Sequence, residues 1–172
     1  HDKNLPHIAE NLNNVGVQLA EVRVVPDIKK EIIDAVNALR RRFDYLFTTG
    51  GIGPTHDDIT AEAVSEAVGR ELIQNQEARR LLEEHFKYNG TEINEARLSM
   101  ANTPKGAELI RNPISTAPGF RVENVYVMAG VPKIMQAMLD NIIPTLQGGA
   151  QKLSRSVLCN LGEGSIAQGL KD

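Results

Sequence analysis

The chain has 172 residues, of which 41% are hydrophobic and 24% are charged, and its formal net charge at pH 7 is −3. This length is sufficient for one domain with a substantial core and a short appendage, and two full domains would fit only if both were small. The slightly acidic balance excludes a global attraction to nucleic acid or anionic lipid, and no apolar run reaches the ~20 residues that a membrane span needs.

The first part of the chain alternates helical and strand-like patterns. Apolar residues recur at helical spacing between Leu5 and Val15, with Asn4 placed as the N-cap and Gly16 placed to end the helix. The β-branched residues of 17–25 predict a strand that stops at Pro26. The pattern then predicts a helix over 28–39 capped by Asp27, a short strand over 45–49 covered on both faces, and a helix over 59–68.

The second part continues the alternation and then changes character. The pattern predicts helices over 75–88 and 92–101, a short strand over 107–110, a hairpin over 119–128 that turns at Glu123-Asn124, and a last helix from Pro132. Helices that alternate with strands predict an α/β fold with a mainly parallel sheet between helices. We expect one domain over residues 1–148, then a linker and the start of a small second subdomain over 149–172.

A glycine-rich stretch, TTGGIGPTHDDIT, follows the strand predicted at 45–49. Ligands of parallel α/β sheets bind beyond the carboxyl ends of the strands, which is where this stretch lies. Gly50, Gly51 and Gly53 allow backbone N–H groups to approach a phosphate, and the helix that begins next adds the positive end of its dipole. The spacing matches neither a Walker loop nor a dinucleotide-binding loop. A tight turn with helix caps is the alternative interpretation.

Two adjacent aspartates, Asp57 and Asp58, end the glycine-rich stretch. Alone they would repel a phosphate, but Mg²⁺ commonly binds between one or two carboxylates and substrate phosphates. The sequence therefore predicts a phosphate site in which a carboxylate holds Mg²⁺. His56, beside them, is compatible with acid–base chemistry and equally with a solvent-facing loop position.

Three separated segments resemble one known family. The Thr48–Thr60 stretch resembles the signature of the molybdopterin-binding (MoCF biosynthesis) domain that MoaB, Mog, MoeA and gephyrin share. Its Pro-Thr-His-Asp-Asp-Ile-Thr ending is most similar to the N-terminal domain of the competence/damage-inducible protein A (CinA) family. Residues 112–120 and 128–133 are similar to the same branch, and residues 161–167 resemble the start of its next subdomain.

The resemblance implies a three-layer α/β/α sandwich with a mainly parallel sheet and an antiparallel hairpin at one edge. Family members open with a strand and an acidic loop, so a first strand is expected ahead of His1. By its place in the motif, Asp58 matches the Mg²⁺-binding aspartate, and Asp57 is a second catalytic candidate or a helix cap. Val131 stands where many relatives have serine, which weakens molybdopterin as the substrate. The implied phosphate-binding residues are Thr49, Gly50, Gly51, Gly53, Thr55, Ser115, Gly130 and Lys133.

For the CinA-like branch, the resemblance implies Mg²⁺-dependent hydrolysis of a nucleotide pyrophosphate bond, as in ADP-ribose. One alternative is adenylylation of molybdopterin in molybdenum cofactor biosynthesis, and another is a non-catalytic module that binds a pterin or a nucleotide. We expect a small-molecule ligand, no nucleic-acid or membrane partner, and a homo-oligomer by analogy with relatives. A single cysteine, Cys159, and the absence of a signal-peptide pattern favour the cytoplasm.

Overall fold

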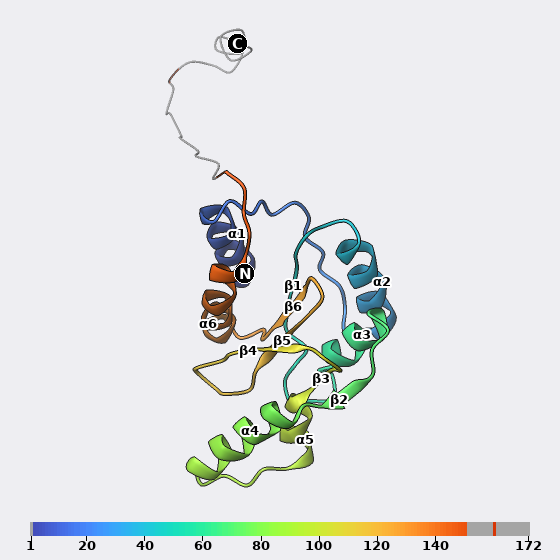
Figure 1. Ribbon diagram of the computed structural model, residues 1–172, viewed down its shortest axis with the longest axis vertical. Helices are drawn as coiled ribbons and strands as arrows, with labels where there is room; N and C mark the ends of the chain where they lie inside the picture. The colour runs from blue at the N-terminus through green and yellow to red at the C-terminus, as the bar shows by residue number, and fades with distance from the viewer. Residues whose placement is uncertain (1, 151–159, 161–172) are drawn as a thin grey trace.

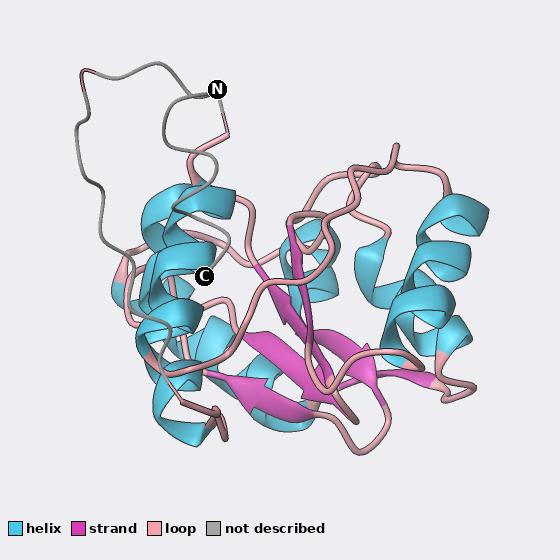
Figure 2. Cartoon of the chain, turned by 90° about the horizontal axis from the view of Figure 1, so that it is seen from above, coloured by secondary structure: helices cyan, strands magenta, loops and turns pink. Residues whose placement is uncertain are grey.

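Helices cover both faces of a four-stranded sheet in the computed structural model, which describes residues 2–150 and 160 (Figures 1 and 2). The helices α1 and α6 lie on one face, and α2 and α3 lie on the other. This three-layer α/β/α arrangement confirms the predicted fold class. The bounds of these four helices are α1 Asn4–Asn14, α2 Lys29–Arg40, α3 Thr60–Ala67 and α6 Pro132–Ile142.

The sheet has the strand order β1-β6-β5-β4. Strand β1 pairs parallel with β6, β6 pairs antiparallel with β5, and β5 pairs antiparallel with β4. Three of these strands therefore point in one direction, and β5 opposes them as part of the predicted hairpin. The carboxyl ends of β1 and β6 lie side by side, with Thr49 in register with Met128. The strands span β1 Leu46–Thr49, β4 Glu108–Ile110, β5 Gly119–Val122 and β6 Val125–Met128.

Each face of the sheet has its own apolar core. Under α2 and α3, Val36 and Val64 pack against the sheet residue Val127. Under α1 and α6, Leu12 and Met135 are buried with the aromatic side chains of the sheet. Because burial of one such side chain contributes about 1.5 to 3 kcal/mol, the two cores fix the sheet against its helices.

A smaller lobe adjoins the main sheet and includes two strands that the sequence did not predict (Figure 1). Strands β2 and β3 pair antiparallel in a separate two-stranded sheet. Each has only three residues, which is too short to show an alternating pattern. The lobe consists of β2 Leu72–Gln74, α4 Gln76–Tyr88, α5 Glu95–Leu98, the 3-10 helix η1 Ser99–Ala101 and β3 Asn102–Pro104. Outside the lobe, a second 3-10 helix, η2 Ile143–Thr145, follows α6.

The prediction of a strand over residues 17–25 is wrong for the structure described. Residues 17–25 form irregular chain and pair with no strand in the described part of the molecule. Their β-branched composition favours a strand, but a strand also needs a hydrogen-bonded neighbour, and a cavity separates the segment from β1.

Two predicted helix caps also differ from the structure. Asp2 Oδ1 accepts hydrogen bonds from the N–H groups of Asn4 and Leu5, so Asp2 holds the start of α1 in place of Asn4. The residue before α2 is Ile28 instead of Asp27, and no side chain caps that helix. No helix among residues 2–150 is long and apolar enough to cross a membrane. The subdomain predicted over 149–172 lies, apart from residues 149, 150 and 160, outside the described residues.

Candidate functional site

The glycine loop, residues 50–58, follows β1 and is closed by backbone hydrogen bonds. The Gly50 N–H donates to the Met128 carbonyl oxygen at 2.9 Å, and the Thr60 N–H donates to the Gly51 carbonyl oxygen at 2.9 Å. Gly50 and Gly51 have φ values of 98° and 70°, which side-chain-bearing residues rarely adopt. The loop therefore leaves the sheet and returns to the start of α3 at Thr60.

A second glycine turn lies against the first. A Cβ placed on Gly130 would lie 3.1 Å from the Gly50 Cα atom, so the two backbones meet without intervening side chains. From α1, the Asn4 side chain donates to the Gly130 carbonyl oxygen at 2.8 Å. The N-terminal end of α6 is thus held beside the glycine loop, as parallel pairing of β1 with β6 requires.

Several N–H groups of these two turns remain available to a ligand. The N–H groups of Gly51, Ile52 and Gly53 have no acceptor within residues 2–150, and neither do those of Gly130 and Val131. Unpaired N–H groups beside a helix start form a favourable environment for an anion. The Gly50 N–H is already used by Met128, so Gly50 shapes the turn and does not donate. Ile52 joins the donors that the glycine pattern indicated.

The carboxylate of Asp58 is oriented by its own loop. Asp58 Oδ2 accepts hydrogen bonds from the N–H of Thr55 at 2.9 Å and from its hydroxyl at 2.5 Å, while Oδ1 makes no hydrogen bond within residues 2–150. A Cβ on Gly53 would lie 2.6 Å from Oδ2, so the carboxylate packs directly on the glycine backbone. A free carboxylate oxygen next to unpaired N–H groups suits a phosphate-bound Mg²⁺, which needs few protein ligands. The Thr55 hydroxyl orients this carboxylate.

Asp57 is exposed and its pKa lies below the ordinary aspartate value. Interaction with the Thr55 side chain is the main cause, although the Thr55 hydroxyl makes its short hydrogen bond to Asp58, and the Asp57 backbone and the charge of His56 add to it. His56 is exposed as well. Within residues 2–150, no three carboxylate, histidine or cysteine side chains gather into a ready-made metal cluster. Any cation here would depend on the ligand's own phosphates.

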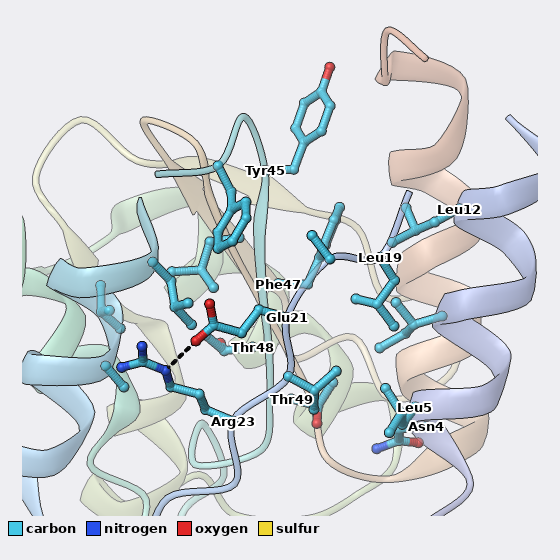
Figure 3. A pocket seen from close by; sticks show the side chains of 18 of the residues that line it. Asn4, Leu5, Leu12, Leu19, Glu21, Arg23, Tyr45, Phe47, Thr48 and Thr49 are labelled. Atoms are coloured by element: carbon cyan, nitrogen blue, oxygen red, sulfur yellow. Dashed lines mark hydrogen bonds and ion pairs between the residues drawn. The ribbon is translucent and has the colours of Figure 1, made fainter. Parts of the chain in front are cut away.

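Two hollows border the glycine loop. The larger, about 790 Å³, runs along the edge of β1 that faces away from β6, with Tyr45 toward one end, Thr49 and Asn4 toward the other, and the Glu21–Arg23 ion pair on its wall (Figure 3). Gly50 and Gly51 lie at the same end as Thr49, so the first half of the loop faces this cavity.

The smaller hollow, about 140 Å³, lies on the other side of the loop. The second half of the loop, with Ile52, Gly53 and Asp58, forms part of its wall, and residues of the smaller lobe form the rest. The sequence pattern did not predict that residues of the smaller lobe would border the glycine loop. The strand that carries Asn102 was not predicted, and a lone asparagine in a connecting segment gives no signal of its own.

The structure brings some predicted site residues together and leaves others apart. Thr49, Gly51, Gly53, Gly130 and Asp58 gather at the carboxyl end of β1, as described above. Ser115 borders neither hollow, and its hydroxyl accepts a hydrogen bond from Asn112 at 2.7 Å. Lys133 is exposed and borders neither hollow. Of the loop that carries Ser115, it is Pro118 that reaches the smaller hollow.

Comparison with known proteins identifies one family over most of the chain. A family profile described as "Probable molybdopterin binding domain" matches residues 1–148. A CinA-like protein of Sulfurihydrogenibium is 38% identical over 157 residues, which cover 88% of this chain and 39% of that protein. A CinA-like protein of Citrifermentans bemidjiense is 36% identical over 184 residues, covering 98% of this chain and 44% of that protein. The chain spans less than two thirds of the length of these curated relatives.

Solved structures agree with the fold. A CinA protein of unknown function from Thermoplasma acidophilum superposes with a TM-score of 0.76 at 31% identity, covering 84% of this chain and 87% of that chain. The molybdopterin biosynthesis enzyme MoaB from a Thermus bacterium superposes with a TM-score of 0.55 at 19% identity, covering 88% and 89%. At that identity the second likeness shows the shared fold alone.

Proposed function

Because the chain belongs to the molybdopterin-binding domain family, in its CinA-like branch, we propose that it is a Mg²⁺-dependent hydrolase of nucleotide pyrophosphates such as ADP-ribose. The observation that carries this proposal is the row of unpaired N–H groups at Gly51, Ile52 and Gly53 beside the free carboxylate oxygen of Asp58. A diphosphate has oxygens that can accept hydrogen bonds from these N–H groups and oxygens that can share a cation with Asp58. The products of ADP-ribose are AMP and ribose 5-phosphate.

The loop supplies charge stabilisation in this proposal. Water attacks one phosphorus, the bridging P–O bond breaks, and negative charge grows on the phosphate oxygens. N–H donors that are already fixed by the bonds of Gly50 and Thr60 stabilise that charge without reorganising. The Gly130 turn, held by Asn4, places a second pair of donors beside the first.

The two aspartates take different roles. Asp58 would hold Mg²⁺, which when bound neutralises the charge of the diphosphate and so strengthens its attachment to the loop. Asp57 is ionised at neutral pH like any exposed aspartate, and its lowered pKa makes it a weaker base than usual. We assign Asp57 to accepting a hydrogen bond from the attacking water and so orienting it.

The test is AMP release by the full chain incubated with ADP-ribose and Mg²⁺. Asp58→Asn keeps the size of the side chain and the bond to Thr55 but removes the charge, so AMP release should fall about a hundredfold or more. Asp140→Asn, on the exposed surface of α6, is the matched control and should retain the wild-type rate. Equal rates for Asp58→Asn and the wild type would refute the proposal.

A binding module is the second candidate, favoured by one observation. The Asp58 carboxylate already accepts two hydrogen bonds within its loop, which is compatible with a structural role in a site that binds a nucleotide or pterin without cleaving it. ADP-ribose bound with micromolar affinity but never cleaved with any divalent cation would favour this candidate. ATP-dependent adenylylation of molybdopterin would favour the transferase instead, although Val131 offers no hydroxyl at the start of α6.

A further inference from the structure

The smaller hollow lies where the main domain meets the smaller lobe, directly beside the phosphate-binding part of the glycine loop. Gly53 and Asp58 belong to both the loop and the wall of the hollow. A ligand whose phosphates contact the loop therefore has this hollow within reach of its next group. Sites between two lobes are common places for small-molecule binding.

The hollow has the size and lining for one planar ring. Its volume is about 140 Å³, close to that of engineered cavities of ~150 Å³ that accept benzene. Ile52 from the loop, Leu72 from β2 and Met100 from η1 supply apolar surface, and Pro118 and Phe120 close the hollow from the main sheet. The rest of the lining is mostly polar and includes Asp58, Glu62, Ser99 and Asn102.

One polar side chain in the hollow is free to recognise the edge of such a ring. Asn102 lies in β3 and is partly exposed, and its side-chain amide makes no hydrogen bond within residues 2–150. By contrast, Ser99 donates to the Ala96 carbonyl oxygen, and Glu62 is paired with Lys29 at 2.8 Å. An asparagine amide offers a donor and an acceptor side by side, which matches an amino group next to a ring nitrogen.

We propose that this hollow binds the amino-bearing ring of a nitrogen heterocycle in which the amino group lies beside a ring nitrogen, with Asn102 hydrogen-bonded to that edge. Adenine and pterin share this chemistry. The inference rests on the proposed function in one respect, that the phosphates of the ligand contact the glycine loop. It does not require hydrolysis, because a ring can bind without it. It makes Asn102 a specificity-determining residue of the site.

The test compares three ligands by calorimetry with the full chain: AMP, purine riboside 5′-phosphate, which lacks the amino group, and ribose 5-phosphate, which lacks the ring. Wild type should bind AMP about tenfold more tightly than purine riboside 5′-phosphate. It should bind purine riboside 5′-phosphate more tightly than ribose 5-phosphate. Asn102→Leu should remove the preference for AMP over purine riboside 5′-phosphate and leave ribose 5-phosphate unchanged. Asn11→Leu, a partly buried asparagine of α1 far from the lobe (Figure 1), should change none of these affinities.

A second readout locates the ring without any change at Asn102. Met100 borders the hollow, whereas Met128, Met135 and Met138 are fully buried. The ring current of a bound heterocycle should shift the Met100 methyl resonance with AMP or 6-hydroxymethylpterin, and ribose 5-phosphate should not shift it. A shift with the pterin alone would identify the ring as a pterin. The inference would be overturned if neither AMP nor 6-hydroxymethylpterin shifted the Met100 signal. It would also be overturned if Asn102→Leu bound all three phosphates as the wild type does, even if ADP-ribose is hydrolysed.

Discussion

The Thr55 hydroxyl donates a hydrogen bond to Asp58 Oδ2 at 2.5 Å, and the Thr55 N–H donates to the same oxygen at 2.9 Å. One residue thus orients the proposed metal ligand from within a nine-residue loop. The other oxygen of Asp58 is left for a cation, and the neighbouring N–H groups are left for phosphate. The loop is organised before any ligand arrives, which reduces the entropy that binding must overcome.

Thr55→Val should raise the pKa of Asp57, because hydrogen bonding from Thr55 is the main cause of its lowered value. A carboxyl whose folded-state pKa is lowered stabilises the fold above its unfolded-state pKa, and that contribution is lost as pH falls through the folded-state pKa. Through Asp57, the variant should therefore have a lower free energy of unfolding than the wild type above about pH 4. This difference should disappear in stronger acid. NMR titration of the Asp57 carboxyl carbon measures the shift, with Thr91→Val as the control. An unchanged Asp57 pKa would show that the Thr55 hydroxyl serves Asp58 alone.

Gly51→Ala should destabilise the protein more than Gly69→Ala. Both glycines have positive φ values, 70° and 68°, so each alanine incurs the left-handed penalty of about 1 to 2 kcal/mol. A Cβ at Gly51 would also lie 2.0 Å from Thr60 Oγ1, whereas nothing lies within 4 Å of one at Gly69. Urea denaturation gives both free energies of unfolding. Adding Thr60→Ala should recover part of the excess at Gly51, and an equal cost at the two glycines would contradict the packing described.

Asn112→Leu should disturb the loop that places Pro118 on the wall of the smaller hollow. Asn112 is 5% exposed, and it donates to Ser115 and Ala117 and accepts from the N–H groups of Ile114 and Ser115. Leucine removes all four bonds and leaves buried groups unpaired, a loss of about 2 to 4 kcal/mol. Asn112→Asp retains the oxygen that accepts from the N–H groups of Ile114 and Ser115, so it should lose less. Denaturation midpoints of the two variants in the opposite order would show that this oxygen does not hold the loop.

Backbone amides of residues 20–25 should exchange with solvent far faster than the amide of Val127. The first group has no backbone hydrogen-bond acceptor within residues 2–150, while Val127 lies in β6 between two paired strands. Hydrogen–deuterium exchange followed by mass spectrometry separates the two. Strong protection of residues 20–25 would mean that the segment forms the strand that its sequence predicts.

The sequence predicted the elements whose pattern is long or well punctuated. The helix before Gly16, the helix that begins at Pro132 and the hairpin around Glu123 all follow from periodicity and turn residues. Periodicity failed for residues 17–25, because β-branched composition does not show whether a neighbouring strand is present. It also failed for β2 and β3, because three residues carry too little pattern.

The candidate site was predictable in place but not in detail. The glycine pattern located the loop, and the resemblance singled out Asp58. The resemblance could not show that the Gly50 N–H pairs with Met128 or that Thr55 binds Asp58, because the first bond depends on the alignment of β1 with β6 and the second on the path of the folded loop. Asn102 was beyond reach for the same reason: its importance comes from the lobe that carries it.

The central claim is that the loop amides and a Mg²⁺ held by Asp58 meet on one diphosphate, and backbone amide NMR of the full chain tests it most directly. Titration with ADP-ribose and Mg²⁺ should give the largest chemical-shift changes at Gly51, Ile52 and Gly53. Without Mg²⁺, or in Asp58→Asn, the same changes should require a much higher ligand concentration. Changes that avoid these three amides, or that are indifferent to both Mg²⁺ and Asp58, would contradict the account.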